Sequence, residues 1–231
     1  MKSKDSWLQD IFCTAPPSAR RGYELVRTVC ADNPTLAPQI VEDLLQQREP
    51  YYQLLGLYGI TLLASPTWES LVLKQIQHND PEVKNSALRA LGFVGTRSSI
   101  HHLLAFARQG HDGALWALKK LMAGFPEYAA QFFDLAEQLL QSENARVREQ
   151  AAAIIVKLGK AQEAEAALVK SAERFADEFT LDALKGASTA TLPRLKKLKA
   201  RFTPEGAEYQ DIVRTIDALE ERHKALVPEI A

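Results

Sequence analysis

Histidine and cysteine are the residues of this sequence best suited to metal binding or nucleophilic chemistry. None of the five histidines is followed by Glu, and only His101 and His102 are adjacent. On a helix, neighbouring side chains point about 100° apart, so one metal ion cannot readily take both. Cys13 and Cys30 form no C-x-x-C pair and have no histidine beside them, which indicates a reduced, cytoplasmic chain. We expect neither a metal nor a cofactor, and the sequence leaves the reactivity of both cysteines open.

Motifs that carry catalysis are missing from the sequence. It has no glycine-rich phosphate loop, no G-x-S-x-G elbow and no cysteine–histidine set. Its 28 basic and 29 acidic residues are interspersed and leave a formal net charge of −1, a balance that does not attract nucleic acid. No run approaches the roughly 20 apolar residues that cross a bilayer. The sequence therefore favours a non-catalytic chain and predicts neither nucleic-acid binding nor membrane insertion.

The elements that would position binding residues follow from short polar breaks that recur along the chain. Four breaks contain Glu49, Asp80, Asp112 and Asn144, at steps of 31, 32 and 32 residues. The same step projects back onto Ser18 and forward to the neighbourhood of Asp177. Asp, Asn and Ser are suitable helix N-caps, and Pro81 fits the first position of a helix. The spacing predicts that a helix begins after each break.

Apolar residues occur at helical spacing on both sides of the breaks. One stripe is Val83, Ala87, Ala90, Leu91 and Val94; a second is Val147, Ala151, Ile154, Ile155 and Leu158; a wider one is Leu54, Leu55, Leu57, Ile60, Leu62 and Leu63. Two antiparallel helices in about 32 residues predict an all-α solenoid. We expect Gly95 and Gly159 to end helices in the left-handed conformation. We also expect Ser65-Pro66 and Thr203-Pro204 to begin helices.

A family resemblance lies in the repeats. The segment DPEVKNSALRALG, residues 80–92, resembles the D-P-x-V-[RK]-x-x-A-x-x-A-L-G signature of HEAT-like repeats of the phycobilin-lyase type. Residues 144–155 resemble it more loosely. We expect a right-handed superhelix of about six HEAT-like hairpins in a single domain, residues 1–231. Residues 1–17 would form an N-terminal cap, 18–188 the repeats, and 189–231 a C-terminal capping hairpin. The basic run 194–201 is expected to be a solvated face compensated by Glu205, Glu208 and Asp211.

The predicted binding surface is the concave face made by the second helix of each hairpin. Positions nine residues after a break read Arg27, Tyr58 and Arg89; positions five residues after a break include Tyr23, Asn85, Glu149 and Asp182. Tyr and Arg carry much of the binding energy at protein interfaces. We predict a protein-binding groove anchored by Tyr23, Arg27, Tyr51, Tyr58, Asn85 and Arg89. An ordinary solvated helix face is the alternative.

Related repeat families suggest other functions. Phycobilin lyases attach or detach a tetrapyrrole, and the match to them lies in repeat-defining residues. Deoxyhypusine hydroxylases hold iron with His-Glu pairs, which this sequence lacks. HEAT-like DNA glycosylases use an Asp, aromatic residues and a basic groove; Asp112, Trp116 and Arg148 are the candidates, although helix capping explains Asp112. The sequence favours a protein-binding scaffold or adaptor, then the lyase, then the glycosylase, and it leaves the partner and the oligomeric state open.

Overall fold

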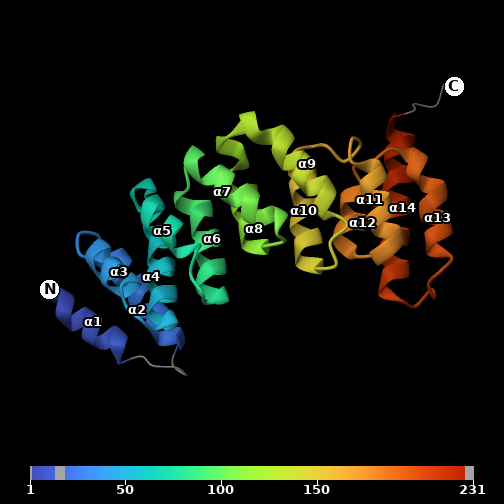
Figure 1. The fold of residues 1–231 in the computed structure, drawn as a ribbon. Helices are drawn as coiled ribbons and strands as arrows, with labels where there is room; N and C mark the ends of the chain where they lie inside the picture. Colours follow the sequence, from blue (N-terminus) through green and yellow to red (C-terminus); the bar gives the residue numbers. More distant parts are fainter. Residues whose placement is uncertain (1, 14–18, 227–231) are drawn as a thin grey trace. The chain divides into compact units, whose positions relative to one another are not determined.

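The computed structural model describes residues 2–13 and 19–226, which form fourteen α-helices joined by turns (Figure 1). Contacts divide the chain into two compact units, each described by itself. Unit 1 contains the described residues of 1–103 together with 116–121, and unit 2 those of 104–115 together with 122–231. The boundary runs through α7 (Arg97–Arg108) and α8 (Asp112–Leu121). The all-α prediction is confirmed, whereas the handedness of the superhelix and the predicted domain limits stay predictions.

Unit 1 is built from helical hairpins stacked side by side. Its helices are α1 (Lys4–Phe12), α2 (Ala19–Asp32), α3 (Ala37–Leu45), α4 (Pro50–Leu63), α5 (Glu69–Gln75) and α6 (Pro81–Val94), with a 3-10 turn at Pro66–Trp68. Helix α4 packs against both α2 and α6, while α3 packs on α4 and α5 on α6. The second helices α2, α4 and α6 therefore form one layer, which we call row 1.

Unit 2 repeats this arrangement. Its helices are α9 (Ala129–Leu139), α10 (Ala145–Lys157), α11 (Glu165–Phe175), α12 (Glu178–Leu184), α13 (Leu192–Lys199) and α14 (Ala207–Leu226), with 3-10 turns at Met122–Gly124, Pro126–Tyr128 and Thr189–Thr191. Helix α12 packs against α10, α11 and α14, and α9 and α13 pack on α10 and α14 respectively. The second helices α10, α12 and α14 form the layer that we call row 2 (Figure 1).

The polar breaks act as helix starts, as the period predicts. The Asp80 carboxylate accepts hydrogen bonds from the backbone N–H groups of Glu82 and Val83, at 2.8 and 3.1 Å. Asn144 and Asp177 cap α10 and α12 in the same way. Glu49 occupies the cap position of α4 without a side-chain hydrogen bond, and Asp112 is the first residue of α8 rather than its cap. Ser18 lies outside the described residues. The step of about 32 residues therefore locates the helix starts, although not every break residue caps.

Most residues of the predicted stripes are buried in the core. Val83, Ala87, Ala90, Leu91 and Val94 are all at most 1% exposed, and burying one large aliphatic side chain contributes about 1.5–3 kcal/mol. The wider stripe of α4 is buried only at Leu55, Leu57 and Ile60, while Leu62 is 40% exposed. Gly56 and Gly59 allow α3 to approach α4, since a Cβ at Gly59 would lie 2.5 Å from Cγ2 of Val41.

Two predicted helix ends are wrong. Gly95 ends α6 in an extended conformation, φ −67° and ψ 141°, rather than a left-handed one. Glycine suits this site because a Cβ would lie 2.5 Å from the Leu91 carbonyl oxygen. Gly159 is left-handed as predicted, at φ 68°. Thr203-Pro204 lies in a turn before α14, which begins only at Ala207. Ser65 does cap, but the element after it is a 3-10 turn that leads into α5.

The basic helix α13 is compensated, but not by the predicted carboxylates. Arg194 makes two hydrogen bonds to Glu173 of α11, at 2.8 and 2.6 Å. Lys196 pairs with Glu220 of α14 at 2.7 Å. Asp211 pairs instead with Arg214 of its own helix. Residues brought close by helix packing therefore compensate Arg194 and Lys196, and they lie farther from these residues in the sequence, before and after the helix, than predicted.

Candidate functional site

All six predicted anchor residues lie in row 1. Helix α2 carries Tyr23 and Arg27, α4 carries Tyr51 and Tyr58, and α6 carries Asn85 and Arg89. The tyrosines are partly buried and pack on a core cluster that includes Val26, Ile40 and Leu55. The rings are therefore held in place by the packing of the helices that carry them.

Three of the six come together around one cavity. It has a volume of about 180 Å³, and its lining includes Tyr23, Tyr58 and Arg89, with Leu54, Thr61 and Ser86 between them. The rings of Tyr23 and Tyr58 meet edge to face, with centroids 5.1 Å apart. Such an arrangement is a favourable geometry for aromatic pairs and fixes both rings. The cavity therefore offers apolar ring surface beside a cationic side chain.

The surroundings of this site keep the Tyr23 hydroxyl neutral and leave the guanidinium groups of Arg27 and Arg89 without a carboxylate partner among the described residues. Burial raises the pKa of Tyr23, with smaller contributions from Tyr51, from the Glu82 carboxylate and from Tyr58. The Tyr23 hydroxyl therefore stays protonated and able to donate a hydrogen bond. Arg27 and Arg89 are exposed and make no ion pair with any residue that the structure describes.

Two of the remaining predicted anchors, Tyr51 and Asn85, are partly buried in the fold. Tyr51 is half-buried and packs on Tyr52, with centroids 5.2 Å apart. The Tyr52 hydroxyl donates to the Phe12 carbonyl at 3.1 Å, so this pair joins α4 to α1. Asn85 is half-buried, and its Oδ1 has no hydrogen-bond partner among the described residues. Neither Tyr51 nor Asn85 lines the cavity.

Aromatic residues that were not predicted as anchors, Phe93 and Trp116, continue this surface within unit 1. The Arg89 guanidinium lies 5.4 Å from the ring centroid of Trp116. Phe93 is 37% exposed and its ring is 5.5 Å from that of Trp116, while Nζ of Lys120 lies 3.8 Å from the Phe93 centroid. A signal for Phe93 existed, because it stands four residues after Arg89 and so shares its helix face.

Two of the three residues considered for base excision, Arg148 and Trp116, have structural roles. Arg148 is 6% exposed; its Nε donates to Asp177 at 2.6 Å, and its Nη1 donates to the Ser142 and Glu143 carbonyls. Its guanidinium also lies 3.8 Å from the Phe175 ring centroid. Arg148 therefore joins α10 to the start of α12 inside unit 2. Trp116 belongs to unit 1 and packs against Gly92.

No cluster of metal-ligating side chains occurs in the part of the chain that the structure describes. There, no group of three or more His, Cys, Asp or Glu side chains could hold a metal ion. His101 and His102 are both exposed. Cys13 is exposed, whereas burial raises the pKa of the half-buried Cys30 thiol to about 11. Cys30 therefore has little thiolate at neutral pH.

Comparison with known proteins identifies the repeat. The model of a family described as HEAT repeats matches residues 37–121, which span α3 to α8. A search of curated proteins finds none that matches this chain significantly. Residues 37–121 are thus similar to HEAT repeats, a class of helical repeat that presents extended binding surfaces.

None of the described helices combines the length and the apolar character needed to cross a membrane.

Proposed function

We propose that this chain is a non-catalytic scaffold or adaptor that binds a partner protein across row 1. The observation that carries the proposal is the cavity that brings Tyr23, Tyr58 and Arg89 together from three helices. HEAT repeats commonly bind partners on such helix rows. Row 1 presents aromatic rings fixed by packing, so little conformational freedom is lost on binding.

The charges of row 1 indicate which partner surface would fit. Arg27 and Arg89 lack carboxylate partners among the described residues, and Lys120 adds a third cation beside Phe93. A partner segment with carboxylates around an apolar or aromatic side chain would complement both features. Arg89 and Tyr58 would be the main anchors, and Arg27, Tyr23, Tyr51 and Asn85 would extend the contact.

The phycobilin-lyase function is the second candidate, carried by the resemblance of residues 80–92. In the structure these residues cap α6 and fill its core stripe, as in any HEAT-like repeat. The row 1 cavity of about 180 Å³ is smaller than the roughly 300–1,000 Å³ of small-molecule pockets. A tetrapyrrole would therefore have to lie on an open surface. Mixing the purified chain with a bilin tests this, because a bound chromophore shifts its visible absorbance.

The scaffold proposal is tested by affinity capture from the native lysate, followed by calorimetry with the captured protein after purification. Wild type is compared with Arg27→Glu plus Arg89→Glu. The matched control is Arg48→Glu plus Lys74→Glu, which changes the net charge equally at exposed sites outside the cavity. We expect the row 1 variant to weaken binding by about 100-fold, since interface hot spots cost 2 kcal/mol or more, and the control to bind like wild type. Equal binding by all three proteins contradicts the proposal.

A further inference from the structure

Row 2 carries a second, chemically different groove. A cavity of about 340 Å³ lies between α10 and α12, and its lining includes the small residues Ala152 and Ala153. Val156 and Phe179 also line it and are 52% and 40% exposed. When large apolar side chains are exposed together in a concave site, they more often belong to a binding surface than to a helix face that only contacts solvent. Glu149, Ala152, Ala153 and Val156 stand at helical positions i, i+3, i+4 and i+7, so one face of α10 supplies half of this groove.

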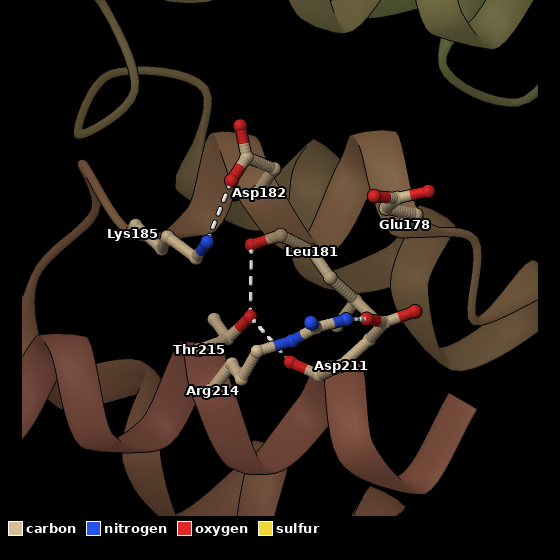
Figure 2. Close-up of a pocket in the computed structure, with 7 residues that line it drawn as sticks. All are labelled: Glu178, Leu181, Asp182, Lys185, Asp211, Arg214 and Thr215. Atoms are coloured by element: carbon tan, nitrogen blue, oxygen red, sulfur yellow. Dashed lines mark hydrogen bonds and ion pairs between the residues drawn. The ribbon is translucent and has the colours of Figure 1, made fainter. Parts of the chain in front are cut away.

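Carboxylates border the apolar part of this groove. Glu149 and Glu178 line it and make no ion pair with any described residue. The adjoining cavity, about 150 Å³, shares Glu178 and Asp182 with the first. In Figure 2, Lys185 donates a hydrogen bond to Asp182, and Arg214 donates one to Asp211. No interaction is drawn for Glu178. Lys157 also lines the first cavity and already has an interaction partner. Glu149 accepts one hydrogen bond, from the Gln150 amide at 3.3 Å, and Glu178 interacts electrostatically with Arg214 without a direct ion pair. Glu149 and Glu178 are therefore the lining carboxylates without an ion pair that an incoming ligand would meet.

We propose that this groove docks a basic amphipathic segment of a partner protein. The segment would insert an apolar side chain between Val156 and Phe179 and place Lys or Arg side chains against Glu149 and Glu178. Apolar insertion supplies the affinity, and the charges fix orientation and exclude acidic segments. This proposal does not rest on the function assigned to row 1, because it uses other residues in the other unit.

The test uses fluorescence anisotropy with the full chain and a labelled helical peptide of leucine and lysine, about 14 residues or four turns long. A peptide with glutamate in place of lysine is the matched probe. We expect saturable binding of the lysine peptide, at least about tenfold tighter than that of the glutamate peptide, and weaker at high salt. Because row 1 is proposed to accept segments with carboxylates, both peptides are also measured with Arg27→Glu plus Arg89→Glu. If the lysine peptide does not bind, or if both peptides bind that variant equally, the proposal is wrong.

Variants locate the binding. Phe179→Ser and the pair Glu149→Gln plus Glu178→Gln should each weaken binding of the lysine peptide by about tenfold, the usual size of a moderate interface contact. Circular dichroism melting checks that both variants fold. The control Asp134→Asn plus Glu205→Gln removes the same charge at exposed positions outside both cavities and should bind like wild type. An equal loss in the control would show bulk charge attraction and overturn the proposal.

Two further measurements exclude other occupants. Arg27→Glu plus Arg89→Glu should leave lysine-peptide binding unchanged, so that failure here is separable from failure of the row 1 proposal. Sedimentation of the chain alone tests for a second copy in the groove. If the chain dimerises and Phe179→Ser abolishes the dimer, the occupant is another copy of this chain, and the proposal of a different partner is overturned.

Discussion

Rows 1 and 2 are made from equivalent helices but present opposite chemistry. At the position five residues after a break, row 1 carries Tyr23, whereas row 2 carries Glu149. At the position nine residues after a break, row 1 carries Arg89, whereas row 2 carries Ala153. Row 1 thus offers tyrosine rings and arginines without an ion pair among the described residues, whereas row 2 offers alanine, valine and phenylalanine side chains beside carboxylates that likewise make no ion pair there. The comparison shows that the repeat fixes where surface positions lie, while the residue at each position decides what can bind there.

The two units also differ in how polar groups connect their hairpins. Unit 2 has the buried Arg148–Asp177 pair, at 2.6 Å with both side chains at most 14% exposed. The equivalent position in unit 1 is Lys84, which is half-buried and makes no ion pair with any described residue. Unit 1 instead uses Glu69, whose carboxylate accepts hydrogen bonds from Thr96 and Ser99. The following predictions test these differences.

The largest expected effect is that of Arg148→Ala. It leaves Asp177 as an uncompensated, mostly buried carboxylate and removes donors to two carbonyls, so we expect unfolding to become easier by about 3–5 kcal/mol. Lys84→Ala, the matched change in unit 1, should cost less than about 0.5 kcal/mol. Urea unfolding followed by circular dichroism measures both. If both variants lower the free energy of unfolding by similar amounts, the proposed difference between the two units is wrong.

Glu69→Gln should have an intermediate effect that depends on pH. Burial alone would raise the pKa of Glu69, but hydrogen bonds from Ser99 and Thr96 together lower it below its ordinary value of 4.5. Its stabilisation is therefore complete above that ordinary value and is lost as the pH falls through the lowered one. At neutral pH we expect a cost of about 1–3 kcal/mol. Urea midpoints measured from neutral to acidic pH should fall less for the variant than for wild type; parallel curves would contradict this role.

Glu173→Gln in unit 2 should have a smaller effect that salt removes. A hydrogen bond from Arg194 lowers the pKa of Glu173, but the side chains are 39% and 49% exposed. We expect a cost below about 1 kcal/mol at low ionic strength, vanishing near 1 M salt because charges at the surface are screened. The cost of Glu69→Gln should persist under the same conditions, since its partners are neutral. A salt-independent cost at Glu173 would remove this contrast.

The smallest expected signal is optical. The three tryptophans are Trp7, Trp68 and Trp116, and all belong to unit 1. Trp116 lies beside Arg89, so binding at row 1 should change tryptophan emission slightly, and Trp116→Phe should abolish the change. Binding of the lysine peptide at row 2 should leave the emission unaltered. A change of emission with that peptide, retained in Glu149→Gln plus Glu178→Gln, would place its binding outside row 2.

Much of the local structure was predictable from the sequence. The caps Asp80 and Asn144 and the apolar stripe of α6 depend on residues within one helix and its cap. At Gly95 the left-handed conformation was mispredicted: the residue is extended, and an added Cβ would meet the Leu91 carbonyl, Leu121 and Ser99. Helix positions are thus a local property, while the conformation at a crowded helix end is not.

By itself, the sequence determined an all-α chain of helical hairpins and the row on which the predicted anchor residues stand. Only the tertiary structure decided which of those residues lie together. Tyr23, Tyr58 and Arg89 share a cavity, whereas Tyr51 packs on Tyr52, which bonds to α1, and Arg148 pairs with a residue of the next hairpin. The physical reason is range: hydrophobic periodicity and capping act within a helix, while contacts between side chains about 30 residues apart depend on how neighbouring helices pack.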